Sequence, residues 1–217
     1  MRMINSQTNS TCKNMGNAKN HVVSVLAKFR NYCDVEVFLK TYLRNYGKIL
    51  EANGVRVSGH SALQYWMPLG YTRENNVLEL QADSKIITWV IDGLKRRGIV
   101  VNPSMDELTN LVGTREPVII VSQLPSWWDK AWVESREEVI AELSRDNPVV
   151  AMELYIYWKY IKDREKQTFW KADGIDEGKI LKYARLYGTL RYVRKILNLD
   201  EELLSRVNDY FKLNLKV

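Results

Sequence analysis

Residues 55–80 read VRVSGHSALQYWMPLGYTRENNVLEL, and this stretch decides the fold class of the chain. Its opening run, VRV, stops at a turn of small residues, and a short helical segment follows at residues 62–66. Pro68 and Gly70 end that segment, and residues 77–80 are again apolar and extended in pattern. The stretch therefore predicts a strand, a tight turn, a helix and a second strand in succession.

The turn has the chemistry of a phosphate site. A turn of small residues between a strand and a helix aims backbone N–H groups and the positive end of the helix dipole at one point. A carboxylate on the adjacent strand, here Glu79, could hold a metal ion against a phosphate bound there. We expect phosphate contacts from the turn and from an arginine in the following loop: Ser58, Gly59, His60, Ser61 and Arg73.

Length and composition set the class of protein. A chain of 217 residues with 46% hydrophobic residues fits one ordinary domain, or one domain with a helical extension. No apolar run approaches the ~18 residues that span a bilayer, and the basic N-terminus lacks the apolar core of a secretory signal. We therefore expect a cytoplasmic protein with no membrane partner. Two cysteines and two histidines without metal-ligand spacing predict no metal site of the zinc type.

The positive charge is concentrated at the two ends of the chain. The net charge is +6, and residues 1–33 and 178–199 contain no acidic residue. Such basic ends on a nearly neutral body are typical of a protein with a polyanionic partner, most often nucleic acid. A solvated surface in a basic protein is the alternative interpretation. The cations that we expect to bind nucleic acid are Lys159, Lys162, Arg164, Lys182, Arg185, Arg191, Arg194 and Lys195.

The chain divides into three parts by composition. Residues 1–20 are poor in large apolar groups, which predicts a flexible basic arm. Residues 21–122 contain helical patterns followed by alternating strands and helices, which predicts a core with a small mixed sheet. Residues 123–217 are predicted to be a helical region. The fold class is therefore α+β, with N-terminal helices and a largely α-helical C-terminal half.

Local signals place several element boundaries. Asp34 and Ser84 are predicted to cap helices, and Ser104 and Glu107 have the spacing of a capping box. Residues 117–121 are apolar without alternation, which predicts a strand buried on both faces.

The C-terminal half reads as a series of helices. The pattern predicts helices at residues 126–145, 148–171 and 176–197, with another from Asp200. Three tryptophans fall at helical spacing in the first of these, which indicates core packing, although they could instead stack on bases. These residues are Trp127, Trp128 and Trp132.

The order of elements and several short motifs resemble the polymerase-beta-like nucleotidyltransferases. The closest likeness is to the minimal ones that act as toxins in bacterial abortive-infection and toxin–antitoxin systems. GHSAL at residues 59–63 matches the glycine turn, Arg73 matches an arginine before the second strand, and VLEL at residues 77–80 matches the acidic strand. Lys159 and KDR at residues 162–164 match a later helix motif. The resemblance covers roughly residues 34–190.

The departures from the family pattern concern the metal ligands. The family uses two or three carboxylates to place two metal ions. Val77 stands in place of the first acid, Glu79 in place of the second, and the later strand ends at Ser122 with no acid. The resemblance thus implies a pseudoenzyme that binds nucleotide or nucleic acid. Glu79 is its only catalytic candidate, and Mg²⁺ would matter only if residual activity exists.

Other interpretations stay open. The chain could be a basic nucleic-acid-binding or structural protein of a virus or mobile element without enzymatic activity, and would then be virion-associated. It could also be a module that binds only another protein. For single residues, His60 could bond to local backbone, Glu79 could be an ion-pair partner, and Arg73 could pair with Glu74.

Overall fold

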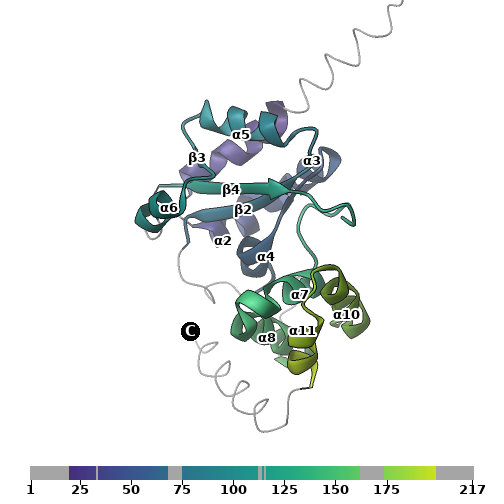
Figure 1. Ribbon diagram of the computed structural model, residues 1–217. Coiled ribbons are helices and arrows are strands. Elements are labelled where there is room, and N and C mark those ends of the chain that lie inside the picture. The colour runs from purple at the N-terminus through teal and green to yellow at the C-terminus, as the bar shows by residue number, and fades with distance from the viewer. Residues whose placement is uncertain are drawn as a thin grey trace, which may run out of the picture. The chain divides into compact units, whose positions relative to one another are not determined.

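The computed structural model of the chain describes residues 20–32, 34–67, 75–111, 114, 116–161 and 174–198. The chain forms two compact units (Figure 1). Unit 1 consists of Met1–Val57 and Glu74–Val133, and unit 2 consists of Ser58–Arg73 and Glu134–Val217. The predicted α+β class is confirmed, because unit 1 contains a mixed sheet with helices and the described part of unit 2 is helical. The predicted arm before residue 20 and the predicted helix from Asp200 lie outside the described residues.

The sheet of unit 1 has four strands in the order β1-β2-β4-β3. They are β1 (Val55–Val57), β2 (Val77–Ala82), β3 (Val100–Val101) and β4 (Val118–Gln123). β1 is antiparallel to β2, with Val57 opposite Leu80, whereas β2 and β3 both run parallel to β4. Val118 and Ile119 of β4 are fully buried, which agrees with the strand predicted from its unbroken apolar run.

Helical segments precede the sheet. Residues 20–26 are helical and continue as the 3-10 helix η1 (Ala27–Asn31). As predicted, the Asp34 carboxylate caps the next segment by accepting a hydrogen bond from the Val37 N–H. That segment comprises α2 (Val35–Val37), η2 (Phe38–Tyr42), η3 (Leu43–Asn45) and α3 (Gly47–Ala52).

The helical segments share an aromatic core. The rings of Phe29 and Phe38, both fully buried, have their centroids 5.1 Å apart, and Tyr32 meets Phe38 edge-on at 5.2 Å.

Gly54 adopts a left-handed φ of 65° between α3 and β1, which glycine tolerates without steric cost.

α5 (Ile87–Lys95) contacts β3 and β4 (Figure 1). The prediction that Ser84 caps this helix is wrong. The Asp83 carboxylate instead accepts a hydrogen bond from the Lys85 N–H, and α5 begins at Ile87 without a side-chain cap. The predicted capping box is confirmed at α6 (Met105–Leu111), where the Ser104 N–H donates to the Glu107 carboxylate at 2.8 Å and the Glu107 N–H donates to the Ser104 hydroxyl.

Asn102 extends β3 with its side chain. Its amide donates to the Val121 carbonyl at 3.0 Å and accepts the Val121 N–H at 2.7 Å, so it takes the place of one peptide group in the ladder. Its backbone has a left-handed φ of 49°, which asparagine tolerates better than most residues.

The helix predicted at residues 126–145 is wrong in its first half. Residues 126–135 form a loop, and α7 (Arg136–Asp146) begins only after Ser135, whose hydroxyl accepts the Glu138 N–H. Ser135 and Glu138 have the Ser-x-x-Glu spacing of a helix start, which is a local signal for this boundary.

The three tryptophans of this loop have different surroundings. The Trp132 ring lies over Gly47, where an added Cβ would be only 2.5 Å from it. The Trp128 indole donates to the Ala131 carbonyl of its own loop, and Trp127 is 38% exposed. Trp132 therefore packs closely on another segment, and it does so half-buried and from a loop of unit 1.

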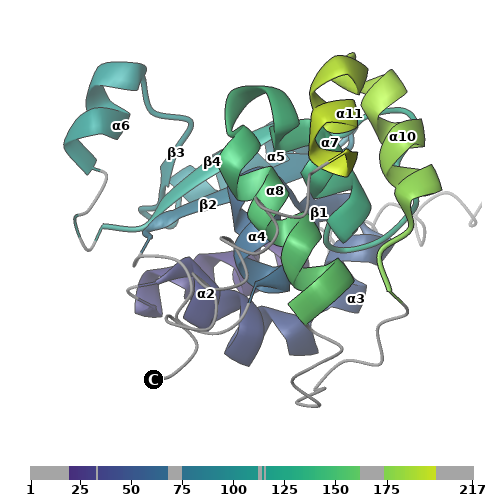
Figure 2. The same cartoon turned by 90° about the horizontal axis from the view of Figure 1, so that it is seen from below.

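Unit 2 is described as a group of helices (Figure 2). They are α4 (Gly59–Trp66), α7, α8 (Pro148–Ile156), its continuation η4 (Tyr157–Ile161), α10 (Glu177–Leu186) and α11 (Leu190–Leu197). The predicted start of a helix at residue 176 is confirmed, and the Asp176 carboxylate caps α10 by accepting the Lys179 N–H. The single helix predicted from residue 176 to 197 is wrong, because Gly188, at a φ of 69°, separates α10 from α11. Among the described residues, no helix has the length and apolar character to cross a membrane.

Candidate functional site

The helix after β1 begins earlier than predicted: α4 starts at Gly59 and not at residue 62, so His60 and Ser61 belong to its first turn. Ser58 is extended at a φ of −136°, and Gly59 is the first residue of α4 with a left-handed φ of 55°. Ser58 and Ser61 are buried, and His60 is only partly exposed. Arg73, predicted to complete this phosphate site, lies outside the described residues.

The Gly59 N–H donates to the Glu134 carboxylate at 2.9 Å. Glu134 is fully buried, and its main-chain carbonyl accepts the Trp66 indole N–H at 2.6 Å. Glu134 thus bonds to both the first and the last residue of α4. A negative group of the protein itself therefore lies at the helix N-terminus, where the sequence suggested a phosphate.

Glu79 lies on β2 in unit 1, whereas the turn belongs to unit 2. It is partly exposed and stands opposite Ile120 of β4. Val77, at the position of the missing acid, is buried. Within the described ranges, no three His, Cys, Asp or Glu side chains gather to hold a metal ion.

Lys159 belongs to a polar network in unit 2. Its ammonium forms an ion pair with Glu177 and donates to the Tyr155 hydroxyl at 2.6 Å, and Tyr155 donates to Glu177 at 2.8 Å. Burial raises the pKa of Tyr155, and the hydrogen bond from Lys159 lowers the pKa of Glu177. This network ties the start of α10 to α8 and η4. The other two candidates from this region, Lys162 and Arg164, lie outside the described residues.

Tyr187 lies among the carboxylates of α7. Its hydroxyl donates to Glu138 at 2.9 Å. Burial raises the pKa of Tyr187, and the charges of Glu134, Glu142 and Glu138 raise it further. Tyr187 is therefore a hydrogen-bond donor to Glu138 within unit 2.

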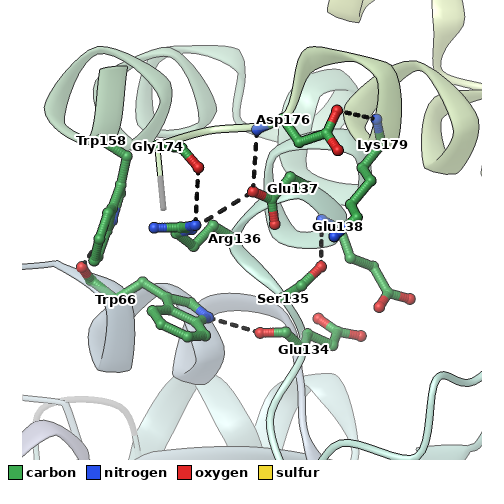
Figure 3. A network of polar contacts seen from close by, with 10 residues as sticks. All are labelled: Trp66, Glu134, Ser135, Arg136, Glu137, Glu138, Trp158, Gly174, Asp176 and Lys179. Carbon is green, nitrogen blue, oxygen red and sulfur yellow. Dashed lines mark hydrogen bonds and ion pairs between the residues drawn. The ribbon is translucent and has the colours of Figure 1, made fainter. Parts of the chain in front are cut away.

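Arg136, at the start of α7, contacts the segment that precedes α10 and two tryptophans (Figure 3). Its guanidinium carbon lies 4.2 Å from the centroid of the Trp158 ring and 5.8 Å from that of Trp66. Its Nη2 donates to the Gly174 carbonyl at 3.1 Å, and its Nε lies 3.6 Å from the Glu137 carboxylate. The Arg136 guanidinium therefore already occupies the space beside the Trp66 and Trp158 rings.

Among the described residues of unit 2, exposed cations gather on α10 and α11, which contact each other. The exposed cations of α10 are spaced three residues apart, which places them along one side of that helix. The exposed cations of α11 lie within about 100° of one another around the helix axis. We call this set the basic face: Lys179, Lys182, Arg185, Arg191, Arg194 and Lys195. It includes every candidate that the sequence placed in this segment. From Gly178 to Asn198 these two helices and their connection carry no acidic residue.

The aromatic residues near the basic face are mostly buried or paired. Tyr183 is 7% exposed and belongs to the core. Tyr192 is partly exposed, but the Arg191 guanidinium lies 4.5 Å from its ring centroid and bonds to its hydroxyl. The described part of this surface therefore offers cations and little open aromatic area for stacking on bases.

The chain was compared with family models, with curated proteins and with solved structures, and none of the three comparisons gave a match.

Proposed function

We propose that the chain is a nucleic-acid-binding protein without efficient catalytic activity, built on a nucleotidyltransferase-like sheet. The observation that carries the proposal is the basic face, with six exposed cations on two touching helices and no acidic residue between Gly178 and Asn198. Such a surface attracts the phosphate backbone, and contacts to phosphates alone carry no base-sequence information. The scarcity of open aromatic area argues against stacking on the bases.

Two features of unit 1 support the nucleotidyltransferase-like part of the proposal. In unit 1, β2 pairs antiparallel with β1, and β4 runs parallel to β2; between β1 and β2 the chain forms α4 of unit 2. The acidic positions of that pattern are reduced to Glu79, since Val77 is buried and apolar. One carboxylate cannot hold two divalent ions close together.

The binding proposal predicts a steep dependence of affinity on salt. With up to six cations in contact with phosphates, the slope of log K against log salt should be about −3 to −5 on duplex DNA. Fluorescence anisotropy with labelled DNA and RNA of unrelated sequences at several salt concentrations measures this slope. A flat salt response, or no binding at low salt, would contradict the proposal.

The catalytic part predicts no nucleotidyl transfer above background. Labelled nucleoside triphosphates incubated with the chain and with Mg²⁺ or Mn²⁺ should give the same trace of product as Glu79→Gln, because a single carboxylate does not assemble a two-metal site. Robust transfer that Glu79→Gln abolishes would show a working active site and refute this part.

A further inference from the structure

We propose that Glu134 is a built-in anion that closes the N-terminus of α4 to external phosphate. The inference is independent of the basic face, because it concerns another surface and another ligand. It assigns the glycine turn a structural task, which is to hold the chain's own carboxylate.

The geometry at the turn carries the inference. The Gly59 N–H is the first donor of α4, and its 2.9 Å bond to Glu134 uses the group that would face a phosphate oxygen. The carboxylate is fully buried, and so are Ser58 and Ser61 beside it. A phosphate entering here would have to displace a charged group of like sign from a site with little access to water.

A main-chain contact of Glu134 helps to hold its position. The Glu134 main-chain carbonyl accepts the Trp66 indole N–H, and the Trp158 indole N–H donates to the Trp66 main-chain carbonyl at 3.0 Å. These bonds join α4 to the start of α7 and to η4. They use main-chain oxygens, so they fix the backbone that carries the Glu134 side chain and are retained when that side chain is changed.

The Ser58–Gly59 amide is a direct probe of this contact. Ser58–Gly59 is the only Ser–Gly pair in the chain, so labelling serine carbonyls with ¹³C and glycine nitrogens with ¹⁵N gives one correlated NMR signal for this peptide bond. In the unaltered protein, this signal should not move on addition of inorganic phosphate or a nucleoside triphosphate, against a chloride control of equal ionic strength.

Two variants show whether the carboxylate is the reason. Glu134→Ala removes the carboxylate, and acetate or phosphate should then shift the signal in a saturable way. The anion concentration at half of the maximal shift should be at least about tenfold lower than for any shift seen in the unaltered protein. Glu134→Gln keeps a hydrogen-bond acceptor of the same shape and should stay unresponsive. A saturable shift in the unaltered protein would overturn the inference, as would a folded Glu134→Ala variant that ignores both anions. If Glu134→Ala does not fold, the titration of the unaltered protein still decides.

Discussion

Reversing two cations of the basic face, in the double variant Arg194→Glu/Lys195→Glu, is expected to weaken nucleic-acid binding about 100-fold or more at low salt. Both residues are exposed in the last turn of α11. Each lost phosphate contact removes roughly 1 kcal/mol, and each new carboxylate repels the backbone. The same anisotropy titration should show a salt slope smaller in magnitude by about 2.

A matched control separates a local effect from a change of total charge. Lys95→Glu/Arg96→Glu changes two adjacent exposed cations at the end of α5 in unit 1 and lowers the net charge by the same amount. It should keep at least roughly a third of the affinity, because long-range attraction between exposed charges is screened at moderate salt. Equal losses in both double variants would mean that binding follows net charge, and the basic face would lose its special role.

Short-range chemistry explains which parts of the fold the sequence could predict. The caps at Asp34, Ser104 and Asp176 depend on a side chain and a backbone N–H three residues away, so the local sequence contains the whole interaction. The strand at residues 117–121 was readable for a similar reason, because an unbroken apolar run is typical of a strand buried on both faces.

Interactions between distant residues explain what the sequence could not predict. Trp132 lies against Gly47, and the room that this glycine provides cannot be seen in residues 126–135 alone. Glu134 bonds to an N–H that is 75 residues away in the chain, so no local spacing indicates it. The break at Gly188 did have a local signal, since a glycine inside a helical pattern costs about 1 kcal/mol relative to alanine.

The cations of the basic face can be read from the sequence, but their division between two helices is a feature of the structure. On a single continuous helix, one face cannot hold all of Lys182, Arg185, Tyr192 and Arg194. The division into α10 and α11 removes that restriction, because each helix needs to orient only its own cations. The glycine turn was also found, but its anion comes from the protein.

The second large effect is expected in unit 2, where Arg136→Ala should lower the free energy of unfolding by about 3 kcal/mol. The Arg136 side chain is 11% exposed, and the Glu137 side chain beside it is 7% exposed. Removing the arginine leaves a buried carboxylate without this partner and takes the cation from the Trp158 ring, and both losses destabilise the folded state. Urea unfolding followed by far-UV circular dichroism measures the change, with separate transitions fitted if the two units unfold independently.

Two further variants identify which loss dominates. Arg136→Lys keeps the charge but not the planar group that lies over Trp158 and reaches the Gly174 carbonyl, so it should recover about half of the stability. The double variant Arg136→Met/Glu137→Gln removes both charges and keeps an acceptor for the Asp176 N–H. It should be more stable than Arg136→Ala, because a buried ion pair replaced by neutral groups of similar size costs less than a buried charge left alone. If all three variants unfold like the unaltered protein, the contacts of Arg136 in Figure 3 contribute little to stability, and α10 must be held to α7 by its apolar packing.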